Sequence, residues 1–167
     1  RFVIRSAGDW TMDFVQTVQP GDTFRLGRGV GRFLPQTGVR RCEQLWVAGG
    51  VGITPFLAAL EQMKPDSGAR VTLIYCIRSR ESAGAISDIE AHATRLPQLD
   101  LIVLSDRSKD RLTPARLTDI VRKMQKNSEV YLCGPEGSKS LVTDVWEIVG
   151  MSGRVISSAL IFGGLMD

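Results

Sequence analysis

The chain has 167 residues, of which 43% are hydrophobic and 23% charged, and its formal net charge is +3. That length is enough for one full domain and part of another. The basic residues are dispersed, so we expect no nucleic-acid partner, and no apolar stretch reaches the roughly 18 residues of a membrane helix. Cys42, Cys76 and Cys133 lack the spacing of a metal site, so we predict none.

The first part of the chain predicts a small, separate piece of structure. In chain order we expect a strand, a short helix, a strand and a glycine-rich loop, at residues 2–5, 14–18, 23–26 and 27–35. A polar connector follows, and we place the domain boundary within it, giving domains 1–40 and 41–167. Because Arg1 already lies in a strand pattern, we expect the chain to be a piece of a longer protein.

Strand and helix patterns then alternate four times before a final strand. The strands are expected at 45–48, 71–77, 101–105, 130–133 and 155–162. The helices are expected from Pro55, near 84–96 with a Ser87–Glu90 capping box, from Thr113, and after Pro135 with Leu141, Val145, Ile148 and Val149 on one face. This alternation predicts an α/β fold with a five-stranded parallel, Rossmann-like sheet and right-handed crossovers.

A glycine-rich bend, Gly49-Gly50-Val51-Gly52-Ile53-Thr54-Pro55, follows the first of these strands. Glycine accepts positive φ and lets a ligand approach the backbone. Thr54 is a good N-cap, and Pro55 suits the first helical position. A strand, a glycine turn and a helix N-terminus together favour an anion such as a nucleotide diphosphate. The alternative is a tight turn that binds no ligand.

A second bend, Cys133-Gly134-Pro135 with Glu136 after it, also joins a short apolar strand to a helix pattern. Parallel strands end at the same edge of a sheet, where open α/β sheets bind their ligands. We therefore expect the two bends to face each other across one crevice.

Together the two bends resemble the pyridine-nucleotide domain of the ferredoxin–NADP reductase superfamily, most closely its ferric reductase and NADPH oxidase branch. The resemblance implies hydride transfer from NADPH, or NADH, to FAD, and then electron transfer to haem, ferric iron or oxygen. It also implies a cytoplasmic location, or the cytoplasmic face of a membrane if a haem membrane domain belongs to the full-length protein. His92 is the sole histidine, so any haem would be held elsewhere.

By the same resemblance, residues 1–40 form the second half of an antiparallel FAD-binding β-barrel whose first half precedes Arg1. Gly8 and Thr11, with Trp10 between them, match an element that places a hydroxyl and a helix N-terminus on the FAD diphosphate. The alternative is an ordinary helix cap. The loop Arg28–Phe33 departs from the family pattern, because Gly29 and Val30 stand where the family has Pro and Tyr.

The resemblance assigns three residues to the nicotinamide and flavin. Cys133 would lie near the nicotinamide C4 without thiol chemistry, Thr54 near the nicotinamide ribose or carboxamide, and Phe162 against the flavin. The alternatives are a core residue for Cys133 and for Phe162, and a simple N-cap for Thr54.

By the same resemblance, the loops after two neighbouring strands approach the adenosine end of the nucleotide. Guanidinium and hydroxyl groups suit a 2′-phosphate, which favours NADPH over NADH. The residues concerned are Arg78, Ser79, Arg80, Ser105 and Arg107. Asp106 interrupts the Ser-Arg pair that NADP-dependent members of the superfamily often have, and solvated loop charges are the alternative.

Two other functions remain open at this point. One is an oxygenase reductase that passes electrons to an iron–sulfur protein. The other is a nucleotide-binding regulatory module without redox turnover.

Overall fold

The computed structural model describes residues 4, 6, 8–25, 33–36, 43–65, 68–105 and 110–158. The chain divides into two compact units, 1–32 and 33–167, and each is described by itself. Arg107 and Phe162 lie outside the described residues. None of the helices described is long and apolar enough to cross a membrane.

The first unit contains one described helix, α1 (Asp9–Thr17). The Trp10 and Phe14 rings stack with centroids 5.2 Å apart, and the Phe14 and Phe24 centroids are 4.9 Å apart. The strand expected at 23–26 is wrong for residues 23–25, which have no strand structure. A strand needs a hydrogen-bonded neighbour, and the exposed backbone at 23–25 has no such ladder. The β-barrel that the sequence resemblance implies stays a prediction.

The second unit is built on five parallel strands, which confirms the predicted α/β fold. The strands are β1 (Glu43–Gly49), β2 (Arg70–Ile77), β3 (Leu99–Ser105), β4 (Glu129–Cys133) and β5 (Val155–Ser158). Their order in the sheet is β3-β2-β1-β4-β5. The chain adds β2 and β3 on one side of β1 and then crosses to the other side for β4 and β5. The strand order therefore reverses between β1 and β4.

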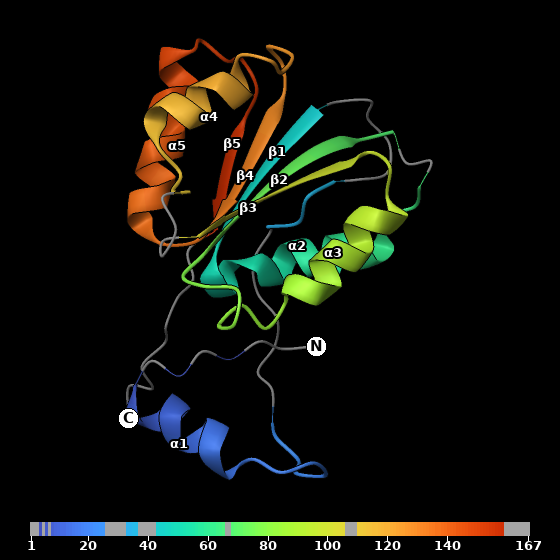
Figure 1. Ribbon diagram of the computed structural model, residues 1–167, viewed down its shortest axis with the longest axis vertical. Coiled ribbons are helices and arrows are strands. Elements are labelled where there is room, and N and C mark those ends of the chain that lie inside the picture. The colour runs from blue at the N-terminus through green and yellow to red at the C-terminus, as the bar shows by residue number, and fades with distance from the viewer. Residues whose placement is uncertain are drawn as a thin grey trace. The chain divides into compact units, whose positions relative to one another are not determined.

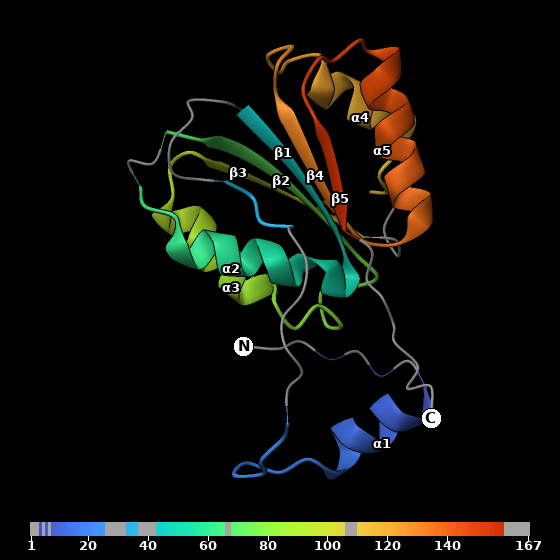
Figure 2. The ribbon, with the colours of Figure 1, turned by 180° about the vertical axis from the view of Figure 1, so that it is seen from behind.

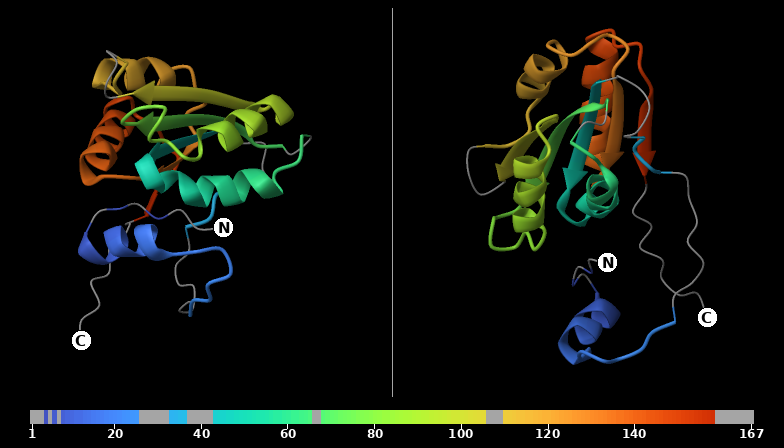
Figure 3. Two further views of the ribbon diagram at one scale, coloured as in Figure 1. Left: turned by 60° about the horizontal axis from the view of Figure 1, so that its bottom comes forward. Right: turned by 90° about the vertical axis from the view of Figure 1, so that its right-hand side faces the viewer.

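Helices cover both faces of this sheet (Figures 1 and 2). α2 (Thr54–Gln62) and α3 (Ile86–Arg95) lie on one face, and α4 (Pro114–Val121) and α5 (Glu136–Ile148) lie on the other, as the end-on views of Figure 3 also show. Each face has its own apolar core. Trp46 stacks on Phe56 at 5.3 Å in the first core, and Trp146 is buried in the second.

The sequence predicted the helix positions better than their details. Thr113 caps α4 as expected, its hydroxyl accepting a hydrogen bond from the Arg116 N–H at 3.3 Å. The Ser87 capping box is wrong, because α3 begins at Ile86 and Ser87 lies inside the helix. The expected apolar face of α5 is also wrong in part. Ile148 is 82% exposed, and the buried residues are Val142, Val145 and Trp146.

Residues 33–36 pack against the rest of the second unit. The Phe33 ring lies edge-on to Phe56 and to Tyr131, with centroids 5.6 and 6.0 Å away. The Gln36 carbonyl accepts a hydrogen bond of 2.7 Å from the Gln44 side chain. The compact unit thus begins at Phe33, while the domain boundary near residue 40 stays a prediction.

Candidate functional site: two glycine bends at the carboxyl edge of the sheet

The two bends lie side by side, as the sequence predicted, but they are in direct contact where the sequence predicted a crevice between them. β1 and β4 are paired with Ala48 opposite Cys133. A Cβ atom on Gly52 would lie 2.0 Å from the Cys133 carbonyl oxygen, and one on Gly49 would lie 2.6 Å from Cδ of Pro135. Real Cβ atoms do not approach other heavy atoms this closely, and neither a backbone carbonyl nor a proline ring can turn aside. Glycine is therefore required wherever the first bend crosses the second.

Gly50 has a different role from its neighbours. Its φ is +54°, in the left-handed region that favours glycine, and a Cβ there would meet no atom within 4 Å. Protein packing explains Gly49, Gly52 and Gly134, whereas Gly50 is exposed and leaves open space at the edge of the sheet. A ligand would therefore reach the backbone of the first bend at Gly50.

The helix that follows the first bend begins at Thr54, but Thr54 is not its N-cap. A 3₁₀ turn (Gly50–Ile53) runs directly into α2, so Thr54 already has helical dihedrals, φ −57° and ψ −44°. Its hydroxyl donates to the Val51 carbonyl at 3.2 Å instead of accepting from an N–H group. No side chain caps the start of α2, but the Thr54 N–H already donates to the Val51 carbonyl of the 3₁₀ turn, and Pro55 has no N–H.

The helix that follows the second bend is also uncapped by a side chain. Pro135 is the N-cap of α5, and its carbonyl accepts from the N–H groups of Ser138 and Lys139 at 3.0 and 3.3 Å. Glu136 lies in the first turn with its side chain 87% exposed. The helix dipole places partial positive charge at this end. Both bends thus present the properties of an anion site.

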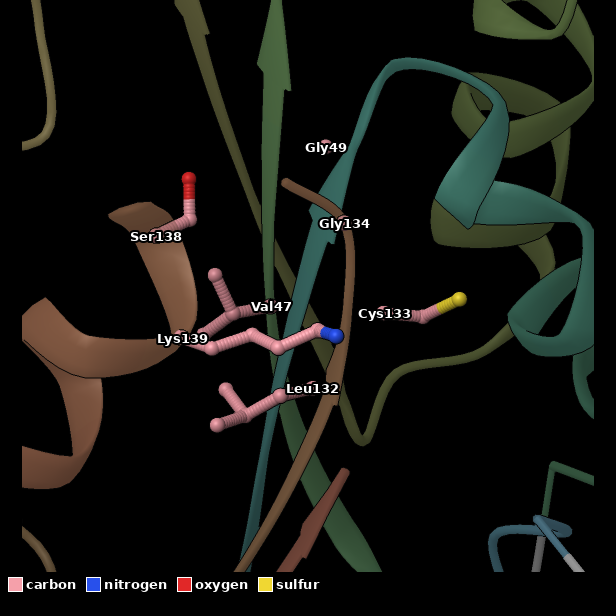
Figure 4. Close-up of a pocket in the computed structure, with 7 residues that line it drawn as sticks. All are labelled: Val47, Gly49, Leu132, Cys133, Gly134, Ser138 and Lys139. Carbon is pink, nitrogen blue, oxygen red and sulfur yellow. The ribbon is translucent and has the colours of Figure 1, made fainter. Parts of the chain in front are cut away.

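A shallow depression lies beside the bends on the α5 side of the sheet (Figure 4). Its described lining residues are Val47, Gly49, Leu132, Cys133, Gly134, Ser138 and Lys139. In this view the Lys139 side chain extends from α5 toward β4, and the Cys133 sulfur points to the other side of the strand. The depression is a surface feature beside the two bends and not an enclosed cavity.

Cys133 is a buried, protonated thiol. Burial raises the pKa of Cys133 above its usual value, and this outweighs the opposing effects of a hydrogen bond from Ser158 and the positive charge of Lys139. The side chain packs in the α2–α3 core. A neutral thiol of this kind is a weak nucleophile, which agrees with the expectation that Cys133 does no thiol chemistry.

The loops after β2 and β3 are joined to each other. The Ser105 hydroxyl donates to the Arg78 carbonyl at 3.1 Å, and the Ser79 and Ser82 hydroxyls are 3.2 Å apart. The Arg80 guanidinium forms an ion pair of 2.7 Å with Glu90, whereas Arg78 is exposed. The structure thus brings four of the five residues of the predicted adenosine end together; the fifth, Arg107, lies outside the described residues.

The residues predicted to contact the FAD diphosphate, Gly8, Trp10 and Thr11, belong to the first unit. Thr11 does not open α1, because the helix begins at Asp9 with Gly8 as N-cap. Its hydroxyl accepts from the Gly8 N–H at 3.0 Å and donates to the Gly8 carbonyl at 2.9 Å. The Thr11 hydroxyl is therefore engaged with its own helix end. The neighbouring Trp10 is 65% exposed.

Sequence reasoning missed two polar residues at the second bend. Lys139 lines the depression, and the Ser158 hydroxyl bonds to the Cys133 thiol. The spacing Glu136–Lys139 was a usable signal, since residues three apart share one face of a helix. Ser158 had no sequence signal, because its position depends on the pairing of β5 with β4.

Known proteins share both the sequence pattern and the fold. Residues 46–143 match the family model described as "Oxidoreductase NAD-binding domain". The carnitine monooxygenase reductase subunit of Escherichia coli (strain K12) is 30% identical over 121 residues, covering 72% of this chain and 35% of the relative. The vanillate O-demethylase oxidoreductase of Pseudomonas putida is 32% identical over 124 residues, covering 73% and 36%. The chain thus spans about a third of the length of these relatives.

Two solved structures show the same architecture. The cytochrome b5 reductase domain of Ulva prolifera nitrate reductase has a TM-score of 0.71 at 17% identity, covering 90% of this chain and 66% of that one. Ferredoxin-NADP+ reductase from Plasmodium falciparum with 2'P-AMP has a TM-score of 0.56 at 16% identity, covering 71% and 52%. At these identities the likeness shows a shared fold.

Proposed function

Because this chain belongs to the oxidoreductase NAD-binding domain family and has the fold of the ferredoxin–NADP reductases, we propose that it is the nicotinamide-nucleotide-binding part of a flavin-dependent NAD(P)H reductase. The observation that carries this proposal is the contact between Gly52 and Cys133. It brings two uncapped helix ends to the switch point of a parallel sheet, where such sheets bind nucleotides.

The residues at the bends suit a dinucleotide. The diphosphate would lie near Gly50 and the first turns of α2 and α5, whose N–H groups have no side-chain cap. Thr54 and Cys133 would flank the nicotinamide, with Gly49, Val51, Ile53 and Pro55 shaping the bend. When bound, the nicotinamide supplies a hydride to FAD. The chain's own task is then to orient the ring and exclude water, since Cys133 is a neutral thiol.

FAD is the second cofactor in this proposal. Gly8, Trp10 and Thr11 would contribute to its site together with residues that precede this chain. α1 has nine residues and carries Asp9 in its first turn. The Thr11 hydroxyl, now bonded to Gly8, would have to exchange those bonds to contact a phosphate.

The loops after β2 and β3 support NADPH as the preferred nucleotide. Arg78 is exposed and its carbonyl is tied to Ser105, so a 2′-phosphate near both residues would gain charge-assisted hydrogen bonds. Arg80 contributes less in this arrangement, because its guanidinium is paired with Glu90. Ser79 and Arg107 complete the proposed set, and Phe162 would cover the flavin.

The relatives, and not the site, support a choice of terminal electron acceptor. Both relatives named above are oxygenase or demethylase reductases by name, which favours an oxygenase component as the partner. A ferric reductase or NADPH oxidase with a haem membrane domain, working at the cytoplasmic face, is the second candidate. The likeness of the bends at 49–55 and 133–135 to that branch is what favours it.

The test uses the full-length protein that carries this chain. We expect it to bind flavin, and we expect NADPH to bleach the flavin absorbance under anaerobic conditions. Full-length protein that binds nucleotide but holds no flavin would indicate a regulatory module instead. If the reduced flavin then passes electrons to an added iron–sulfur protein but not to haem, the protein is a reductase of the oxygenase type.

A further inference from the structure

Lys139 is placed unusually for a lysine. Its side chain is only 14% exposed, and its stem lies in the depression formed with Val47 and Leu132. Lysine is seldom buried to this extent unless it is paired. The Lys139 ammonium is 3.2 Å from a carboxylate oxygen of Glu136, whose side chain is 87% exposed. A largely covered lysine side chain is thus paired with a carboxylate that is almost entirely in water.

The electrostatic setting of Lys139 favours a further anion. Lys139 lies in the first turns of α5, where the helix dipole disfavours positive charge. Among the described residues that line the depression, Lys139 carries the only charged side chain. The neighbouring Cys133 thiol is neutral, so it offers no countercharge. A single solvated carboxylate is a weak partner for such a group.

We propose that Lys139 is a binding residue for the dinucleotide diphosphate, and that Glu136 holds its ammonium group while the site is empty. This inference rests on the proposed function. Gly49 and Gly134 line the same depression as Lys139, so the depression that holds this side chain borders both bends. The exposed Glu136 side chain is free to turn into solvent when a diphosphate replaces it. Glu136 then acts against nucleotide binding, and Lys139 acts for it.

Opposite signs for the two residues separate this proposal from a structural ion pair. If the ion pair only stabilises α5, K139M and E136Q remove the same contact and change nucleotide binding in the same direction. If Lys139 binds the diphosphate, K139M weakens nucleotide binding while E136Q strengthens it. Methionine keeps the unbranched apolar stem of lysine, so K139M removes mainly the charge.

The experiment is calorimetric titration of the full-length protein with ADP-ribose, which carries the diphosphate, and with adenosine, which does not. We expect K139M to weaken ADP-ribose binding about tenfold and E136Q to strengthen it severalfold, because charged hydrogen bonds are worth at least a factor of ten. Adenosine binding should not change. K126M and E147Q, which alter exposed residues away from the bends, should bind like the wild type.

Several results would overturn the assignment of Lys139. If E136Q weakens ADP-ribose binding as much as K139M does, the two residues form only a structural pair. If K139M binds ADP-ribose normally, Lys139 is not part of the site. If K139M does not fold, E136Q still decides, since unchanged or weaker binding contradicts the proposal. Wild-type protein that binds no ADP-ribose would instead refute the proposed function itself.

Discussion

Gly52 lies against the Cys133 carbonyl so closely that a Cβ atom on Gly52 would be 2.0 Å from that oxygen. The obstacle is backbone on a paired central strand, so it cannot turn aside as a flexible side chain would. This contact joins the end of β1 to the end of β4 and fixes the two bends relative to each other. The nucleotide site that we propose at the switch point depends on it.

The first prediction concerns this contact. We expect G52A to lower the free energy of unfolding by about 1–3 kcal/mol, the usual cost of an overpacked site. G84A is the matched control, because a Cβ on Gly84 meets no atom within 4 Å, and we expect its effect to be within about 0.5 kcal/mol. Urea denaturation of both variants measures the difference. Equal stabilities would mean that the bends are not tightly joined.

The second prediction concerns Arg95, which caps the end of a neighbouring helix. Its guanidinium donates to the Leu60 and Met63 carbonyls, both at 2.8 Å, and so satisfies the last turn of α2 from the end of α3. We expect R95A to destabilise the protein by about 1 kcal/mol, since the bonds are partly exposed to water. R122A, at the end of α4, serves as the control in the same denaturation experiment.

Arg95 also contributes to the lowered pKa of His92. Burial lowers the pKa of His92, the positive charge of Arg95 lowers it further, and Glu61 and Asp88 oppose both effects. A lowered pKa in the folded state means that the unfolded state binds the proton more readily. Stability is therefore full above about pH 6.5, the usual histidine value, and falls as the pH drops through the folded-state pKa.

His92 is the sole histidine, so NMR titration of its ring protons gives this pKa directly. We expect a midpoint below the usual value in the wild type and an upward shift in R95A. A midpoint at or above the usual value in the wild type would contradict the described packing of α3.

The third prediction concerns a buried polar group under the connector. The Tyr131 hydroxyl donates to Glu129 at 3.1 Å, and Arg154 donates twice to the other oxygen of Glu129 at 2.7 and 3.0 Å. We expect Y131F to lower the free energy of unfolding by about 1–2 kcal/mol, because it leaves a buried carboxylate oxygen of Glu129 without the Tyr131 donor. Y75F is the control, since the pKa of Tyr75 is raised by burial alone. Thermal unfolding that ranks Y75F as the more damaging change would refute this.

The fourth prediction separates the two arginines of the proposed adenosine end. We expect the protein to bind 2′-phospho-AMP more tightly than AMP, and R78A to remove most of that preference. R80A should reduce it less, because Arg80 is already paired with Glu90. Titrations of the three proteins with both nucleotides provide the measurement. Equal affinities in the wild type would assign the protein to NADH.

The sequence predicted those features that depend on local pattern. Alternating strand and helix signals gave the parallel sheet, and glycine next to Thr54 and Pro55 located the start of α2. What it missed depended on contacts between distant segments. Phe33 belongs to the predicted loop, but the sequence did not show that its ring packs on Phe56 and Tyr131.

The sequence predicted that the two bends lie together, but not the contacts that join them. It offered a ligand, or a tight turn without one, as the reason for the three glycines of the first bend, whereas the structure explains Gly49 and Gly52 by the second bend and leaves Gly50 open. Thr54 was expected to cap a helix, but a 3₁₀ turn precedes it and its hydroxyl bonds to Val51. Such details depend on backbone conformation, which residue types alone do not determine.

The central claim is that a nicotinamide dinucleotide binds where the two bends meet. Its most direct test is amide NMR of this chain during titration with NADPH or NADH. We predict that the amide signals of Gly50, Gly134 and Glu136 shift most, together with those of the first turn of α2. Shifts confined to the opposite, amino-terminal edge of the sheet, or no shifts at all, would contradict the account.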